Sequence, residues 1–284
     1  MDGYVTRAEF DAPTGLSGGR HYESLHGTIY SWIDLYVNDT LNHVIRRVCS
    51  GPAPPNSYCS SNAGTVQTVA GTGQSGYVNG PAASAQFSFI AGGIGGSYVA
   101  DSANNVLRYF DGANVSTFAG NGTPGLVNGP ASEAEFAAPT DIAQDYSNNT
   151  FVVDAGNQAI RRIDVNGNVT ILAGNGQYGY RDGPGSSAEF YLPTGAAWNP
   201  SDGNIYVSDT LNNVIRRVDP SGNVTTYAGV QSSPGLANGA LASAEFDLPT
   251  GIAVSGTTMF IADTLNGVIR EVNMSTGQVT TAFQ

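Results

Sequence analysis

The stretch Asp39-Thr40-Leu41-Asn42-His43-Val44-Ile45-Arg46 contains a pattern, Asp-x-x-Asn-x-x-(Ile/Leu)-Arg, that occurs five times along the 284-residue chain. The other copies span residues 101–108, 154–161, 209–216 and 263–270. A fixed period of about fifty to sixty residues is the sequence signature of a repeat architecture, so this pattern decides the fold. A residue that recurs in every copy is expected to serve the repeat, and a specific site is expected where the copies differ.

The bulk composition excludes some classes of function. Charged residues make up 12% of the chain, the net charge is −12, and all eleven basic residues are arginines, so there is no lysine. Nucleic-acid binding needs a broad basic surface that neutralises phosphates, and this chain cannot assemble one. No stretch approaches the roughly 18 consecutive apolar residues of a membrane span. We therefore expect neither a nucleic-acid partner nor a membrane span.

The only two cysteines, Cys49 and Cys59, flank a short excursion rich in Pro, Ser and Asn. A lone pair of this kind predicts a disulfide that closes a loop in an oxidising compartment. Two free thiols are the alternative. A metal site is not predicted, because no Cys-x-x-Cys motif or neighbouring Cys/His pair accompanies the cysteines.

Seven Asn-x-Ser/Thr acceptors for N-glycosylation point to the same compartment. They are Asn38, Asn114, Asn121, Asn148, Asn168, Asn223 and Asn273. A repeated turn sequence generates Asn114, Asn168 and Asn223, so these three are not independent, and Asn121 and Asn148 are expected to be the most accessible. The acceptors, the cysteine pair and the missing lysine together predict an extracellular or cell-surface protein.

The fourth copy shows the predicted structure of one repeat most clearly. Short strands are expected at residues 193–197, 205–208, 214–218 and 224–229, with Asn/Asp/Gly/Pro turn clusters between them. Four short strands joined by tight turns form one antiparallel sheet. Such a sheet cannot bury both of its faces alone, so the units are expected to stack around an axis as a β-propeller rather than in a linear solenoid.

A long Gly-rich connection follows each repeat and ends in a fixed Ala-(Glu/Gln)-Phe phrase. Because it recurs, we expect the connection to pack, with each Phe buried between adjacent sheets. The prediction is one domain, residues 1–284, with blades at roughly 1–73, 74–121, 122–175, 176–230 and 231–284.

The phrase from Tyr206 to Asp219, followed by Gly222 to Gly229, resembles an NHL repeat, and the long connection is similar to that of long-loop members of the family. The resemblance covers essentially the whole chain and implies an all-β propeller of four-stranded NHL-type blades. Five blades are visible, whereas family members resemble six-bladed propellers most often. Either five blades close a ring, or the chain is a segment of a six-bladed or larger protein.

The residues that recur in every copy are interpreted as structural. The repeated Asp and Asn are expected to fix the turn between the second and third strands through hydrogen bonds to backbone amides. The repeated Arg is expected to be a buried or semi-buried partner for a carboxylate, and the Glu of Ala-Glu-Phe is one candidate for that carboxylate. Gln86 occupies that position in the second copy, so Arg108 would need Asp101 or Asp111 instead.

The first copy departs most from the others. It carries an insertion between Thr14 and Val37, the cysteine pair, and all three histidines of the chain. The functional interpretation is a local binding surface with aromatic anchors; the alternative is a decorated loop with solvated histidines. The candidate binding residues are His21, Tyr22, His26, Tyr30, Trp32, His43 and Tyr58.

Three classes of function remain in view. A resemblance to the lyases of the NHL-like group would imply a metal centre built from histidines on several blades. Here all histidines fall in one blade, so no catalytic residue, metal or cofactor is predicted. The favoured expectation is a non-enzymatic extracellular scaffold or building block of an assembly, whose partners are proteins, including copies of itself or neighbouring domains. A ligand-binding or sensor propeller is the alternative, and a propeller lyase or hydrolase is less favoured.

Overall fold

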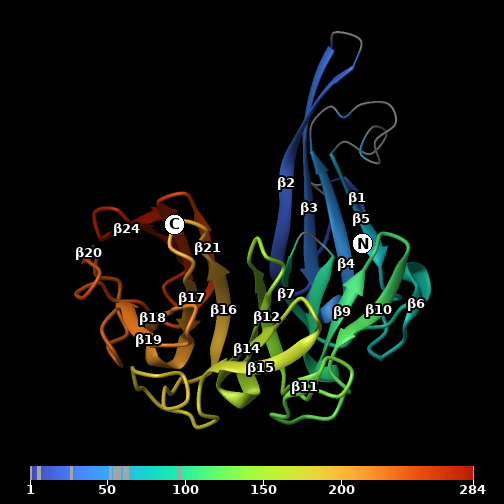
Figure 1. Ribbon diagram of the computed structural model, residues 1–284. Helices are drawn as coiled ribbons and strands as arrows, with labels where there is room; N and C mark the ends of the chain where they lie inside the picture. The colour runs from blue at the N-terminus through green and yellow to red at the C-terminus, as the bar shows by residue number, and fades with distance from the viewer. Residues whose placement is uncertain are drawn as a thin grey trace. The chain divides into compact units, whose positions relative to one another are not determined.

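The structure is a computed structural model that describes residues 2–4, 8–25, 28–50, 53, 59, 64–94 and 97–283. It is all-β and contains five antiparallel sheets, one for each copy of the repeat, which are the blades of a β-propeller (Figure 1). The chain divides into two compact units, Met1–Phe118 and Ala119–Gln284. Among the described residues, no helix has the length and apolar character needed to cross a membrane.

The first unit contains two blades. Blade 1 consists of β1 (Gly3–Tyr4), β2 (Pro13–Leu25), β3 (Thr28–Asp39), β4 (Val44–Ser50) and β5 (Thr65–Ala70), in the order β1-β5-β4-β3-β2. Blade 2 consists of β6 (Gly80–Pro81), β7 (Ile90–Ile94), β8 (Tyr98–Asp101), β9 (Val106–Phe110) and β10 (Asn114–Ala119), in the order β6-β10-β9-β8-β7.

The second unit contains the other three blades. Blade 3 consists of β11 (Gly129–Pro130), β12 (Pro139–Gln144), β13 (Thr150–Asp154), β14 (Ala159–Ile163) and β15 (Asn168–Ala173). Blade 4 consists of β16 (Pro193–Trp198), β17 (Ile205–Asp209), β18 (Val214–Val218) and β19 (Val224–Ala228). Blade 5 consists of β20 (Gly239–Ala240), β21 (Pro249–Ser255), β22 (Thr258–Asp263), β23 (Val268–Asn273) and β24 (Gln278–Phe283).

The four-stranded prediction is confirmed with one addition. In the fourth copy, every observed strand ends within one residue of its predicted boundary. Four of the five sheets gain a short outer strand (β1, β6, β11 or β20), in which two residues of the long connection pair with the outermost strand. Blade 4 has a single bridge there, between Gly183 and Val224. The long connection therefore packs, as its recurrence predicted.

The Phe of the fixed phrase is buried in four copies, namely Phe87, Phe136, Phe190 and Phe246. In the first unit, Phe87 packs with Ile45 and Ala70 of the preceding blade. In the second unit, Phe190 packs with Ile160 of blade 3, and Phe246 packs with Ile215 of blade 4. Within each unit the core thus lies between consecutive blades, as predicted. Phe10 of the first copy differs, because 37% of it is exposed.

Candidate binding surface on the first blade

The insertion in the first copy forms a two-stranded ribbon. Strands β2 and β3 contain 13 and 12 residues, whereas the first strands of the other blades contain 5 to 7. The ribbon is paired in register from Pro13↔Asp39 to Leu25↔Thr28. Strand β4 pairs with β3 only as far as Ile33↔Ser50, so the end of the ribbon projects beyond the third strand of the blade (Figure 1). Both of its edges leave backbone groups without a neighbouring strand among the described residues.

A buried ion pair holds the base of the ribbon. Asp34 of β3 is buried, and both of its carboxylate oxygens accept hydrogen bonds from Arg47 of β4, one of them from Nε at 2.6 Å. The Arg47 guanidinium also lies over the Tyr36 ring, 5.4 Å from its centroid. Bidentate pairing with a carboxylate fixes the orientation of both side chains. The ribbon therefore leaves the blade from a rigid base.

The predicted disulfide is confirmed and lies beside this base. Cys49 and Cys59 are bonded, both are buried, and Cys49 pairs in register with Asp34. The disulfide and the base of the ribbon therefore lie at the same end of blade 1. The two sulfurs and the Asp34 carboxylate lie within 4.8 Å of one another. Because the sulfurs are bonded to each other, they supply no thiolate for a metal.

Most of the predicted binding side chains lie outside the described residues. The backbone register places His21 opposite Trp32 and Tyr22 opposite Ser31, and Tyr30 lies opposite Glu23, so four of the candidates are brought together on the ribbon. The side chains of these four are not described. His26 and Tyr58 lie entirely outside the described residues. Their role in binding stays a prediction.

His43 is separated from the ribbon. It follows the Asp-x-x-Asn turn, at the other end of strands β3 and β4, with a left-handed backbone (φ 53°). Its Nδ1 accepts a hydrogen bond from the Phe89 amide of blade 2 at 3.3 Å, and the two rings meet edge to face. Gln158 and Asn213 occupy the same position in their repeats and accept the corresponding amide of the next blade. His43 thus performs the linking role that its repeat position has in other blades.

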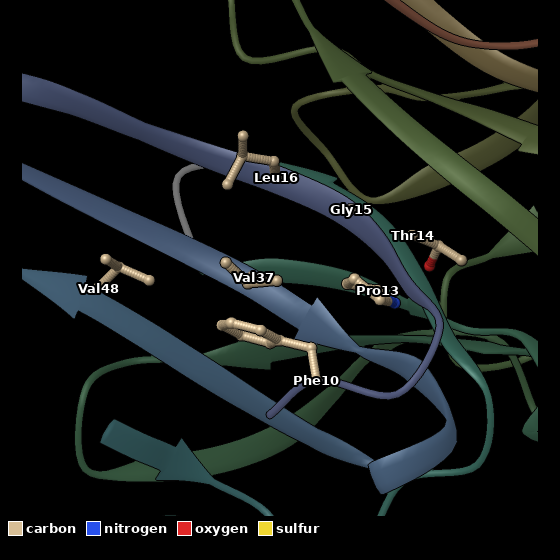
Figure 2. A pocket seen from close by; sticks show the side chains of 7 residues that line it. All are labelled: Phe10, Pro13, Thr14, Gly15, Leu16, Val37 and Val48. Atoms are coloured by element: carbon tan, nitrogen blue, oxygen red, sulfur yellow. The ribbon is translucent and has the colours of Figure 1, made fainter. Parts of the chain in front are cut away.

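A groove of about 380 Å³ lies on one face of blade 1 (Figure 2). Its lining is mostly apolar and includes Phe10, Leu16, Val37 and Val48. The residues at the same repeat positions in blade 4 are Phe190, Ala196, Val207 and Val218, and blade 3 covers them. The groove therefore belongs to the repeat surface that packs between blades.

The buried arginines are paired differently from the prediction. Arg108, Arg161, Arg216 and Arg270 are fully buried, and each lies 2.6–2.8 Å from the Asp seven residues before it in its own repeat. Arg46 pairs with Asp39 in the same way. The expected pairing with the Glu of Ala-Glu-Phe is wrong: in each copy the arginine donates to the backbone carbonyl of that residue, and its carboxylate partner is the Asp. Because Gln86 has the same carbonyl, it serves Arg108 equally well, and of the two candidate acids Asp101 is the partner.

The repeated Asp does fix the turn. In every copy it accepts a hydrogen bond from the Asn three residues later. It also accepts one from the backbone amide that follows the fixed phrase, as the Ala137 amide donates to Asp154. Burial raises the pKa of Asp101, Asp154 and Asp209, and these hydrogen bonds oppose that shift. The motif is one structural cluster repeated five times.

One departure from the repeat, at Asp141, was not predicted. Asp141 on β12 stands where β16 has Gly195 and β21 has Gly251. Its Oδ2 accepts a hydrogen bond from the Ala196 amide of blade 4 at 2.9 Å. Burial raises the pKa of this carboxyl to about 7. The signal was in the sequence, because Pro-Thr-Asp replaces the Pro-Thr-Gly of three other copies.

The comparisons with known proteins agree with this fold. No protein-family model matches the chain. It is 30% identical over 139 residues to Protein SUPPRESSOR OF QUENCHING 1, chloroplastic, of Arabidopsis thaliana, and 29% identical over 140 residues to NHL repeat-containing protein 2 of Homo sapiens. Each match covers 45% of this chain, and they cover 13% and 19% of those relatives. The chain therefore matches only a small part of the length of these curated relatives.

Solved structures show the same fold at low identity. An auxiliary nutrient binding protein from Bacteroides ovatus superimposes on 86% of this chain and 58% of its own, with a TM-score of 0.56 and 19% identity. Virginiamycin B lyase from Staphylococcus aureus covers 100% of this chain and 88% of its own, with a TM-score of 0.52 and 14% identity. The five blades and the curated relatives together define the class of protein: the chain is an NHL-repeat β-propeller.

Proposed function

We propose that this chain is a non-enzymatic, extracellular or cell-surface propeller that binds a protein partner through the ribbon of blade 1. It would act as an interaction scaffold or as a building block of an assembly, with copies of itself or neighbouring domains among its partners. The observation that carries the proposal is the projection of β2 and β3 beyond β4, on a base fixed by Asp34, Arg47 and the disulfide.

The physical argument concerns the edges of the ribbon. A two-stranded hairpin is at best marginally stable in water, and an uncovered edge presents unpaired N–H and C=O groups to another chain. Addition of a partner strand to such an edge gives affinity through main-chain hydrogen bonds. Among the described residues, the pairing beyond Ile33 has no third strand of its own blade to support it. A partner strand along that edge would stabilise the ribbon. The side chains of the ribbon would determine which partner strand binds.

The setting is supported separately. A buried disulfide persists in oxidising compartments, and the bond between Cys49 and Cys59 closes a loop at the base of the ribbon. Loops placed on a rigid scaffold commonly carry recognition. In an extracellular binding role, the disulfide would stabilise the base from which the binding ribbon projects.

Hydrogen exchange tests the proposal directly. Amide exchange would be measured on material isolated from its natural source and on the purified recombinant chain. We expect the amides of residues 19–32 to exchange more slowly in the natural material, and the buried strands of the blades to exchange equally in both. Equal exchange of the ribbon in the two samples would contradict the proposal. The alternative, a ligand-binding or sensor propeller, predicts added protection in the first strands β12, β16 and β21 instead.

A variant provides the matched control. Replacing residues 21–32 by Asn-Gly joins Arg20 to Ile33 through a two-residue hairpin turn and leaves the β3–β4 pairing in place. This shortened chain should fold with unchanged stability of the other blades and should lose association with the natural material. Retained association would place the partner elsewhere.

A further inference from the structure

The seven glycosylation acceptors differ in what their side chains already do. Asn38 is buried and donates to blade 2. The amide nitrogens of Asn168 and Asn223 donate to Asp164 and Asp219. Asn114 is exposed, and its backbone amide donates to Asp111. The carboxamides of Asn38, Asn168 and Asn223 are therefore engaged within the protein.

Two more acceptors are also engaged. The Asn121 amide nitrogen donates to the Glu133 carbonyl, and its oxygen accepts the Thr123 amide. The Asn273 oxygen accepts two backbone amides, those of Ser275 and Thr276. Asn148 and Asn114 differ from these five, because their side chains are exposed and make no hydrogen bond to any described residue.

A shift of one position in a shared turn explains the difference. The turns 164–168 and 219–223 both have the pattern Asp-x-x-x-Asn, and their fifth residue, the acceptor asparagine, is bound by the Asp. The turn 145–149 has the same pattern, and Asp145 binds the Asn149 side chain at 2.7 Å. The acceptor here is the fourth residue, Asn148, whose backbone takes a left-handed conformation (φ 62°). The turn is therefore held by Asp145 without using the acceptor side chain.

An exposed aromatic ring lies two residues before the acceptor in the same turn. Tyr146 is 83% exposed, and its ring meets Trp198 edge to face with centroids 4.7 Å apart. Trp198 packs on the core cluster of blades 3 and 4. The Tyr146 ring is thus supported on one side and open to solvent on another. An exposed aromatic face has an apolar surface that can cover the C–H face of a sugar.

We propose that Asn148 is the preferred N-glycosylation site of this protein and that the first sugar packs against Tyr146. The inference rests on the extracellular function proposed above. In the transfer, Asn148 Nδ2 forms a bond to the anomeric carbon of a lipid-pyrophosphate-linked oligosaccharide. The bond from that carbon to the phosphate oxygen breaks, the lipid pyrophosphate leaves, and Nδ2 loses one proton. Thr150 supplies the hydroxyl residue of the acceptor sequence Asn148-Asn149-Thr150.

Glycopeptide mapping after expression through a eukaryotic secretory pathway tests the site. We expect Asn148 to be glycosylated in most molecules, more fully than any other acceptor. Asn148→Gln should remove that glycan. Asn168→Gln is the control, because the Asn168 side chain is hydrogen-bonded to Asp164, and it should leave the main glycoform unchanged. An unmodified Asn148 beside a glycan at another acceptor would overturn the inference. A chain that is glycosylated at Asn148 when secreted but carries no glycan and no disulfide in natural material would support the site and contradict the extracellular function.

The contact with Tyr146 has its own readout. The melting temperature of each glycosylated chain would be compared with that of the same chain after enzymatic removal of the glycan. The glycan should raise the melting temperature of the natural sequence and of Tyr146→Phe, and should raise it less or not at all in Tyr146→Ala. An equal increase in all three chains would contradict packing of the sugar on the ring.

Discussion

At the scale of single residues, each blade is organised around one buried arginine. Arg161 donates to Asp154, to the Glu135 carbonyl, to the Val127 carbonyl and to Asn128, and its guanidinium lies 5.1 Å from the centroid of the buried Phe of its blade. A buried charge is tolerated when an opposite charge is in contact and further hydrogen bonds compensate for the lost water. Both Nη atoms of Arg161 are bonded in this way, and its Nε has no partner among the described residues. The cluster ties the long connection to the third strand, so the same residues that neutralise the charge also hold the connection on the sheet.

Removal of one partner should therefore be costly. Arg161→Leu leaves the Asp154 carboxylate buried without its cation, and we expect it to lower the free energy of unfolding by about 3–5 kcal/mol. Glu135→Gln is the control, because only the backbone carbonyl of that residue contacts Arg161; a change within about 0.5 kcal/mol is expected. Urea unfolding of the two variants measures both. A larger loss of stability for Glu135→Gln than this expected change would instead favour pairing of the arginine with the Glu side chain.

The sequence predicted the burial of these arginines but assigned the wrong partner. Recurrence of Arg and Glu in each repeat suggested a pair, yet recurrence does not show which groups are close in space. The actual partner, Asp154 for Arg161, had already been given the role of fixing the turn, and it performs both roles. Gln86 was the informative exception, because an amide can replace Glu only where the backbone does the binding.

At the scale of the elements, the first strands of blades 3 and 4 are joined by an unusual contact. Thr194 and Thr210 pair through their hydroxyls at 2.6 Å within blade 4. In blade 3, Ala155 replaces the second Thr, and the buried Thr140 hydroxyl has no hydrogen-bond partner among the described residues. Asp141 binds the Ala196 amide beside it. A titratable carboxyl thus links two blades where other repeats have a glycine.

This contact predicts a dependence of stability on pH. The pKa of Asp141 is raised by burial to about 7 in the folded chain, above about 3.9 for an unfolded Asp. The folded chain therefore binds more protons between these values, so the stability contributed by the neutral carboxyl is full below about pH 4 and is lost as pH rises through about 7. The packed strands β16 and β21 contain no ionisable side chain, and on β13 only Asp154 does, paired with Arg161.

Comparison of the natural chain with Asp141→Asn isolates the effect. Urea unfolding at about pH 5 and about pH 8 should show a larger loss of stability at the higher pH for the natural chain than for the variant. Asp141→Gly, which restores the residue found in β16, should behave like Asp141→Asn. Parallel losses in all three chains would show that Asp141 does not titrate in this range.

The disulfide contributes at the same scale. It closes a short loop with a sequence separation of 10, and restriction of the unfolded chain by a loop of this size contributes about 2–3 kcal/mol. The double variant Cys49→Ser, Cys59→Ser should lower the unfolding free energy of blade 1 by that amount. Hydrogen exchange of the β4 and β5 amides measures this loss of stability within blade 1. If the double variant left β4 protection unchanged while a reductant lowered it in the natural chain, the stabilisation would have another origin.

At the scale of the whole molecule, the repeat period predicted the five blades, their strands and the packing of the Phe residues. The ribbon was predicted only as an insertion. Its residues include Gly18, Gly19 and many polar side chains, which resemble a loop locally, and the pairing of Pro13 with Asp39 depends on contacts distant in sequence. Sequence patterns report local preference well, whereas an edge without a third strand is visible only in the sheet.

Amide exchange of the ribbon tests the central claim most directly. Residues 19–32 should be protected in material from the natural source relative to the purified chain, because a partner strand would bind the N–H groups that β4 leaves uncovered beyond Ile33. The buried strand β14 serves as the internal reference and should exchange equally in both. Slow exchange confined to the ribbon is the predicted result. Identical exchange of the ribbon in both samples would contradict the account.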